Sequence, residues 1–290
     1  MRLARQATGA GRTGRYWPVR QDELRRRLEE LYRTYDLRYV TPDPLEHVRA
    51  QSCDADREVV GLVASALAFG TVAQIKKSIA TVLAALGPGP AEAVDRLDPR
   101  AAAARLRGLK HRGVDGRDVA CLRHFARQMR ERRGSIEAFF AEGLGEADDH
   151  VGPALASFAR RALALDHGGL YRGRALPPDA GVRYFFPSPE GGSACKRLNL
   201  YLRWMVRSDS VDLGLWRRPR PAQLVLPLDA HTYAIARRVR LTRYRSASWA
   251  MALDVTRRLR RFDPGDPVKY DFAFHRLGLF RRREEIDGLR

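Results

Sequence analysis

Cysteine is scarce in this sequence. The 290 residues include three, Cys53, Cys121 and Cys195, which lie far apart along the chain. Such spacing supplies neither a disulfide framework nor a cluster of metal ligands, and three thiolates are too few for an iron–sulfur cluster. We therefore expect a reduced, cytoplasmic protein.

Long apolar runs are missing as well. No stretch reaches the length of about 18 consecutive apolar residues that indicates a transmembrane helix. The basic residues near the N-terminus are followed by no apolar segment, so we expect no secretory signal. The apolar share of the composition, 44%, is nevertheless that of a globular protein.

Acidic residues are few beside basic ones. The chain has 34 Asp and Glu against 53 Lys and Arg, which gives a formal net charge of +19. This imbalance causes self-repulsion that a polyanionic partner relieves. Nucleic acid is the first choice of partner, and an anionic membrane surface or a merely biased composition are the alternatives.

Lysine is the rarest basic residue, because nearly all of the positive charge is arginine. The five lysines are Lys76, Lys77, Lys110, Lys196 and Lys269. A guanidinium group is not deprotonated in proteins, whereas a lysine amine can be. A lysine in such an arginine-rich chain therefore marks a place where an amine is needed.

Strand-like alternation is almost absent, apart from the short segment Gln223–Leu228. Helical spacing of apolar residues recurs instead, most clearly over Asp56–Leu86, where Phe69-Gly70-Thr71 interrupts it, and over Trp249–Phe262. We expect an all-α protein of about ten to twelve helices without internal repeats.

The segment Gly191–His231 carries the clearest candidate for chemistry. A glycine turn precedes Lys196, which we expect in the first turn of a helix, where backbone N–H groups form an anion site. The helix dipole disfavours a protonated lysine there, and nearby Arg197 and Arg203 act in the same direction. Lys196 is therefore a candidate nucleophile, with an ordinary phosphate-binding lysine as the alternative.

Asp229 follows a short apolar segment and precedes the next expected helix. Its carboxylate can accept a proton from the Lys196 amine or stabilise positive charge that develops on a sugar. The alternative is a helix N-cap, which does not exclude the catalytic role. We expect His231 to be structural rather than catalytic.

The strings GGSACKRLNLYL and LPLDAHTYAIARRV resemble the helix-hairpin-helix DNA glycosylases, in which a hairpin precedes a catalytic lysine and the next element opens with a catalytic aspartate. From Pro42 to Gly278, the strings SACKRLN, LRWMVR, PLDAHT and DPVKYDFA are similar to a bacterial family of unknown function within that superfamily. The long separation of Lys196 and Asp229 is closer to the archaeal 8-oxoguanine glycosylase branch.

The resemblance implies a bi-lobed, all-α helix-hairpin-helix glycosylase-like fold. Its central helical barrel spans residues 55–206 and ends in the hairpin, and its second lobe combines residues 21–54 with 222–290. A basic loop, residues 207–221, connects the two. Residues 1–20 form a basic arm that contacts phosphates or is simply disordered.

The implied activity is base-excision repair: removal of a damaged base, such as an oxidised purine, with abasic-site lyase activity through a Lys196 Schiff base and Asp229. The implied partner is double-stranded DNA with a damaged base or abasic site. The resemblance implies a monomer near the nucleoid, with no metal, other cofactor or membrane. The alternative is a non-catalytic DNA- or RNA-binding protein that keeps the fold.

Phe69 stands where glycosylases insert a side chain into the DNA stack, and a core position is its alternative role. The basic loop next to the lysine–aspartate pair is a candidate for contact with DNA through Arg217, Arg218 and Arg220. The expected DNA contacts are Gly191, Gly192, Ser193, Phe69, Gly70, Thr71, Lys76, Lys77, Arg197, Arg217, Arg218, Arg220 and His231.

Overall fold

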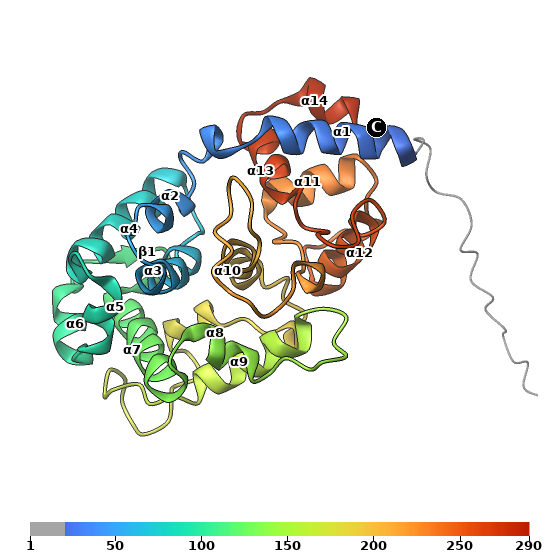
Figure 1. The fold of residues 1–290 in the computed structure, drawn as a ribbon. Helices are drawn as coiled ribbons and strands as arrows, with labels where there is room; N and C mark the ends of the chain where they lie inside the picture. Colours follow the sequence, from blue (N-terminus) through green and yellow to red (C-terminus); the bar gives the residue numbers. More distant parts are fainter. Residues whose placement is uncertain (1–20, 290) are drawn as a thin grey trace, which may run out of the picture.

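The computed structural model describes residues 21–289, which are mostly helical, so the expected all-α class is confirmed (Figure 1). The predicted basic arm, residues 1–20, lies outside the described residues. No described helix is both long and apolar enough to cross a membrane. The α-helices and strands are α1 (Gln21–Thr34), α2 (Leu45–Arg49), α3 (Asp54–Ala66), α4 (Val72–Leu86), α5 (Pro90–Asp95), α6 (Pro99–Arg105), β1 (Lys110–His111), β2 (Val114–Asp115), α7 (Gly116–Arg133), α8 (Ile136–Ala141), α9 (Gly152–Leu163), α10 (Lys196–Val206), α11 (Ala230–Arg238), α12 (Trp249–Leu259), α13 (Asp271–Leu279) and α14 (Arg283–Gly288).

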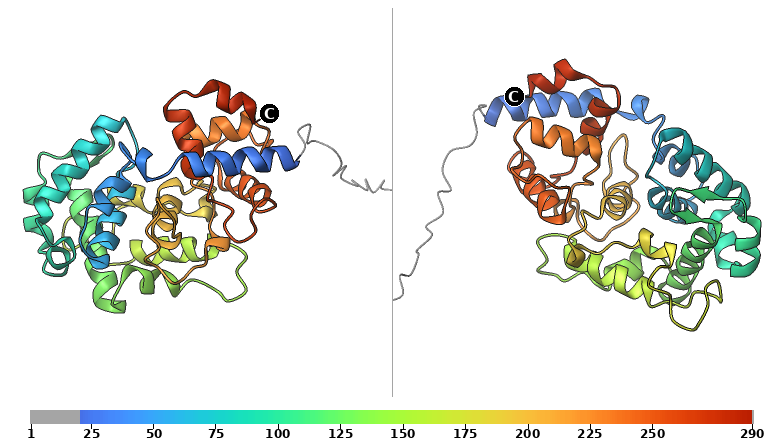
Figure 2. Two further views of the ribbon diagram at one scale, coloured as in Figure 1. Left: turned by 45° about the horizontal axis from the view of Figure 1, so that its top comes forward. Right: turned by 180° about the vertical axis from the view of Figure 1, so that it is seen from behind.

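Helix α10 lies in the middle of the molecule, with the other helices arranged around it (Figures 1 and 2). On one side, α2 and α10 both pack on α3, and α4 to α6 continue that lobe toward α7. On the other side, α11 packs on α13, and α1 crosses over to contact α13. The first helix and the last helices therefore form one lobe, although they are far apart in the sequence.

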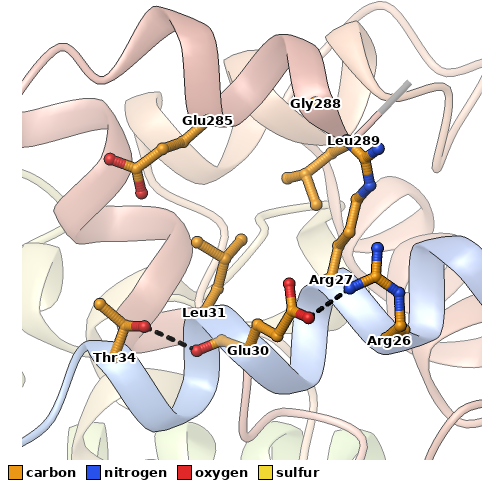
Figure 3. Close-up of a pocket in the computed structure, with 8 residues that line it drawn as sticks. All are labelled: Arg26, Arg27, Glu30, Leu31, Thr34, Glu285, Gly288 and Leu289. Atoms are coloured by element: carbon orange, nitrogen blue, oxygen red, sulfur yellow. Dashed lines mark hydrogen bonds and ion pairs between the residues drawn. The ribbon is translucent and has the colours of Figure 1, made fainter.

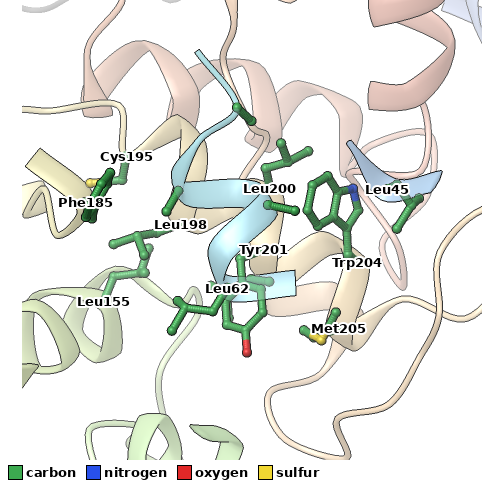
Figure 4. Packing of buried hydrophobic residues seen from close by; sticks show 14 of the residues in the cluster. Leu45, Leu62, Leu155, Phe185, Cys195, Leu198, Leu200, Tyr201, Trp204 and Met205 are labelled. Atoms are coloured by element: carbon green, nitrogen blue, oxygen red, sulfur yellow. The ribbon is translucent and has the colours of Figure 1, made fainter. Parts of the chain in front are cut away.

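The core is built around α10, in which every residue from Arg197 to Val206 is buried. Its apolar side chains contact residues of several surrounding helices (Figure 4). Helix α3 approaches closely at Gly61, where an added Cβ would lie 2.9 Å from the Met205 side chain. The Tyr201 hydroxyl donates a hydrogen bond of 3.1 Å to the Glu58 carbonyl near the start of α3. Because Lys196 meets the other end of α3, the two helices run antiparallel.

Two details of the arrangement bear on the expected organisation. Helix α2, which lies within the residues 21–54 expected in the second lobe, packs on α3. The element before the Lys196 turn is a short 3₁₀ helix, Pro189–Gly191, and not the α-helix that a hairpin between two helices requires. Proline lacks a backbone N–H donor, so the sequence with Pro187 and Pro189 does not support a regular α-helix there.

Ion pairs of Arg203 and Arg207 hold α10 to the C-terminal lobe and to the loop that follows α10. Arg203 pairs with Asp271 of α13 at 2.5 Å and with Asp212 at 3.2 Å. Arg207 pairs with Asp212 and, at 2.8 Å, with Asp266. Both arginine side chains are 2% exposed, so these charges depend on each other for the solvation that water no longer provides.

We expect Arg207→Met to lower the free energy of unfolding by about 3–5 kcal/mol, because it removes the buried cation that Asp209, Asp212 and Asp266 share. Arg96→Met is the matched control, since Arg96 is 80% exposed and pairs with Glu92 one helical turn away. That control should lose less than about 1 kcal/mol. Urea unfolding of the three proteins measures both effects, and equal losses would contradict the role given to Arg207.

Candidate active site

A cavity of about 410 Å³ opens between the two lobes beside the N-terminus of α10. Its walls come from the segment before α2, the loop between α3 and α4, the starts of α4, α10 and α11, and one face of α13. The lining residues are Pro42, Asp43, Pro44, Ala68, Phe69, Gly70, Val72, Ile75, Lys196, Leu200, Arg203, Pro227, Leu228, Asp229, Ala230, His231, Asp271, His275 and Leu279.

Lys196 is the first residue of α10, as expected, and its side chain lines this cavity. Its Nζ donates a hydrogen bond of 2.7 Å to the Ala68 carbonyl oxygen. Burial lowers the pKa of the Lys196 amine, against the opposing charges of Asp229, Asp43 and Asp271. More of this amine is therefore unprotonated, and so nucleophilic, than in an exposed lysine.

Asp229 is the N-cap of α11, and its Oδ1 accepts a hydrogen bond of 2.7 Å from the Thr232 N–H. Its Oδ2 lies 2.5 Å from Nδ1 of His275 on α13. Burial alone raises the pKa of a carboxyl group, but the hydrogen bonds with His275 and with the Thr232 N–H hold the pKa of Asp229 well below its usual range. The group is a carboxylate at neutral pH.

The loop between α3 and α4 is held on two sides. Nζ of Lys196 binds the Ala68 carbonyl, and Nε2 of His111 lies 2.8 Å from the Phe69 carbonyl oxygen. Nδ1 of His111 in turn lies 2.8 Å from the Ser78 hydroxyl. Gly70 has a φ of 101°, a conformation that side chains rarely adopt, and this lets the chain turn into α4.

The Phe69 ring is half-buried in a group of stacked side chains at the edge of the cavity. It meets the His111 ring edge-to-face at 4.4 Å and the Tyr184 ring at 4.9 Å between centroids. The Arg197 guanidinium lies over both Phe69 and Tyr184, at 4.9 and 3.8 Å. Arg197 is buried there, so it is not placed to contact a phosphate as expected. Tyr184 is 52% exposed and is the open ring of the group.

The other expected DNA contacts are distributed over the surface. Gly191 and Gly192 are exposed, and the Gly192 carbonyl accepts a 3.0 Å hydrogen bond from the Trp249 N–H. Ser193 bridges to Ser248, and Thr71 caps α4, so the hairpin and Thr71 border the site without lining the cavity.

The basic side chains separate into groups. Lys76 pairs with Glu46 at 2.8 Å, whereas Lys77 is exposed beside Lys110 in a hollow between α4 and β1.

The arginines of the connecting loop are not near the cavity. The backbone N–H of Trp216 donates a hydrogen bond of 2.7 Å to the Met205 carbonyl oxygen. Arg217 and Arg218 therefore lie at the C-terminal end of α10, opposite Lys196. Their backbone N–H groups bind Glu137 of α8. Helix α10 is about 16 Å long, so the expectation that Arg217 and Arg218 lie next to Lys196 is wrong. Arg220 does not line the cavity.

The sequence analysis missed three polar residues of the cavity: His275, Asp271 and Asp43. His275 and Asp271 stand four residues apart on α13, so they share one face of an otherwise apolar helix. That spacing is a signal the sequence contains. Asp43, which pairs with Arg276 at 2.5 Å, comes from a proline-rich segment without periodicity, and no sequence pattern identifies it.

A second cavity, of about 310 Å³, lies between α1 and α14 (Figure 3). It contains none of the expected site residues. One of its charged side chains, Arg26, pairs with Glu23 and Glu30 on the exposed face of α1. Within residues 21–289, no three His, Cys, Asp or Glu side chains are grouped to hold a metal ion. The cavity beside α10 is therefore the candidate site.

Residues 43–280 match the family described as "Protein of unknown function (DUF2400)". The chain belongs to this family. The match includes Lys196, Asp229 and His275 and thus the main polar groups of the cavity. No curated protein and no solved structure matches the chain.

Reductive methylation with formaldehyde should modify Lys196 faster than Lys77 at neutral pH, because only an unprotonated amine attacks an aldehyde. Formaldehyde is small enough for the cavity, and the exposed Lys77 in the same chain is the internal control. Mass spectrometry of peptides after brief labelling compares the two. Faster labelling of Lys77 would contradict the lowered pKa of Lys196.

Proposed function

We propose that this chain is a DNA base-excision glycosylase with abasic-site lyase activity, in which Lys196 is the nucleophile and Asp229 its partner. One observation carries the proposal. An amine with a lowered pKa, on the first residue of α10, and an ionised carboxylate, at the N-cap of α11, line the same cavity between two lobes. Their two helices also give the order along the chain that the resemblance to helix-hairpin-helix glycosylases implies.

The proposed reaction requires a primary amine. The Lys196 lone pair attacks C1′ of the sugar, and the damaged base leaves with the electrons of the glycosidic bond. After the sugar ring opens, the nitrogen and C1′ form a Schiff base, and loss of a C2′ proton expels the 3′ phosphate. The Asp229 carboxylate stabilises the positive charge that the sugar carries as the base departs. Arginine cannot replace Lys196, because its guanidinium stays protonated.

The cavity is suited to a base turned out of the duplex. Its volume of about 410 Å³ exceeds that of a single nucleobase, and Phe69, Ile75 and Leu200 contribute apolar walls for a planar ring. The carboxylates and histidines of the cavity supply polar groups that can hydrogen-bond to the edge of the base. The net charge of +19 favours a polyanion as the molecule that brings the base.

The mostly helical, two-lobed arrangement supports a bi-lobed glycosylase-like fold, in which the cleft between the lobes holds the reacting residues. The 3₁₀ helix before the Lys196 turn is a departure from the usual hairpin, but the exposed glycines leave its backbone open to a phosphate. A DNA- or RNA-binding protein without chemistry is the rival function, and it does not explain the lowered pKa of Lys196.

We expect borohydride to trap wild-type protein on a duplex with a damaged or abasic site, because it reduces the Schiff base to a stable bond. Lys196→Gln and Lys196→Arg should both abolish trapping and strand cleavage, while DNA affinity stays within roughly tenfold. Asp229→Asn should slow base removal by about 100-fold or more. Gel electrophoresis of trapped complexes measures the adduct.

Two outcomes of that experiment would contradict the proposal. Absence of trapping for the wild-type protein on oxidised, alkylated, deaminated and abasic duplexes alike would favour the binding protein. Retained trapping by Lys196→Arg would assign the nucleophile to another amine. Lys269 is a poor substitute, because it pairs with Glu29 at 2.8 Å and with Asp263 at 2.7 Å.

We further expect the two rings at the cavity edge to respond differently. Tyr184→Ala should slow processing of a paired substrate by about tenfold and spare a single-stranded one, because its exposed ring is free to stack on a base. Phe69→Ala should lower stability by about 2 kcal/mol, less than the loss of roughly 3–5 kcal/mol for a fully buried ring, and slow both substrates alike. Single-turnover rates and urea unfolding separate them. If Phe69→Ala slowed only the paired substrate, Phe69 would be the side chain that inserts into the DNA stack.

A further inference from the structure

Both oxygens of the Asp229 carboxylate already have hydrogen-bond partners within the protein. One of its oxygens accepts from the Thr232 N–H at 2.7 Å, and the other lies 2.5 Å from Nδ1 of His275. Both contacts are short, and the side chain of Asp229 is 13% exposed. The oxygens are therefore directed mainly toward the protein and only partly toward the cavity.

His275 presents the opposite situation. Its side chain is 29% exposed and lines the cavity, and Nδ1 makes its contact with Asp229. Within the described part of the chain, Nε2 has no hydrogen-bond partner. A carboxylate only accepts hydrogen bonds, so it selects the tautomer with hydrogen on Nδ1 and leaves the lone pair of a neutral ring on Nε2. The free basic nitrogen of the pair thus belongs to His275.

The surroundings hold the His275 ring in this position. The His231 ring meets it edge-to-face at 5.3 Å between centroids. Helix α13 approaches His231 closely because residue 278 is glycine, where an added Cβ would lie 2.5 Å from Cβ of His231. One turn before His275 on α13, Asp271 is fixed by Arg203 at 2.5 Å. The ring is therefore anchored through its own helix, its neighbour and Asp229.

We infer that His275 is the proton acceptor of the site and that Asp229 acts largely through it, as the group that orients and stabilises its ring. This inference rests on the proposed function, since the proton comes from the Lys196 amine. It differs from that function in the group to which the proton goes. His275 lies outside the residues that the resemblance implies.

The step balances without another reactant. The Lys196 amine attacks the C1′ aldehyde of an opened abasic sugar and forms an N–C bond, while the carbonyl π electrons move to oxygen. Nε2 of His275 accepts a proton from the nitrogen and returns it to the oxygen, which gives the carbinolamine. A second proton follows the same path from nitrogen to oxygen, so that the oxygen leaves as water and the C=N bond forms. During the transfer the Asp229 carboxylate stabilises the imidazolium. No metal or redox partner is involved.

Asp229→Asn has a distinct consequence under this inference. An asparagine can keep its oxygen on the Thr232 N–H and turn its amide N–H toward Nδ1 of His275. The ring must then accept at Nδ1 and carry its hydrogen on Nε2, where it can no longer take a proton. The loss caused by Asp229→Asn is therefore partly a loss of His275.

The test uses the full chain and a duplex with an abasic site, with the single-turnover rate of borohydride trapping as the readout. His275→Ala removes the acceptor, and His275→Asn keeps an N–H donor near the position of Nδ1 but has nothing at Nε2. Both should slow trapping by about 100-fold. Added imidazole should restore His275→Ala at least tenfold toward the wild-type rate, because it can occupy the space of the missing ring.

Controls separate chemistry from structure. Lys196→Gln with imidazole gives the background cleavage by imidazole itself, and urea unfolding of each His275 variant excludes loss of the fold as the cause. His150→Ala is the matched histidine control, since its ring packs against Trp249 away from the cavity, and imidazole should not change its rate.

The possible failures differ. A wild-type chain that forms no adduct refutes the proposed function itself. An active wild-type chain together with His275→Asn at nearly the wild-type rate refutes this inference and leaves His275 as a positioning residue for Asp229. A folded His275→Ala that loses activity but gains nothing from imidazole also overturns it.

Discussion

The buried ion pairs of Arg203 and Arg207 are the interaction on which the rest of the structure depends. Taking such charges out of water costs more than a single pair recovers, so each arginine needs several acidic partners. Those partners come from the C-terminal lobe and from the loop after α10, with Asp212 shared between both arginines. The charges fix where α10 sits against α13, because apolar contacts alone tolerate small shifts that a paired charge does not.

The position of α10 decides the geometry of the site. Its first residue is Lys196, and α13, held by the same arginines, carries His275, which binds Asp229. The two halves of the candidate site are thus connected through one buried network, although they belong to different lobes. On the opposite wall, the carbonyls of Ala68 and Phe69 are held by Lys196 and His111, so the loop before α4 depends on the same arrangement.

Much of this could be predicted from the sequence, because local signals and tertiary packing agree there. The break at Phe69–Thr71 between two helices and the helix after Asp229 follow from apolar periodicity and capping. The helix-hairpin-helix motif that the resemblance implies has a helix before its hairpin, but the structure has a 3₁₀ turn there, because the prolines prevent a regular α-helix. The place of Arg217 depends on how a long loop folds back on α8, which no local pattern encodes.

Charge patterns were a weaker guide than periodicity. The sequence analysis expects Arg197 to contact DNA from the surface, yet its side chain is buried and packs against the Phe69 and Tyr184 rings. His275 is a single histidine in an apolar helix, and its importance follows only from its contact with Asp229. Both cases arise because a side chain's function depends on the residue it meets across the fold, which sequence spacing on one helix does not specify.

Asp229 follows the local rules for a helix N-terminus, whereas Lys196 does not. Asp229 stands where a helix dipole favours a negative charge and where its oxygen caps α11. Lys196 occupies the first turn of α10, where the same dipole disfavours a positive charge. The residue before it, Cys195, has a φ of 48° and gives no side-chain cap. A helix selected for stability alone has no use for this combination. Such local costs concentrate at functional sites, where the surrounding fold compensates for them.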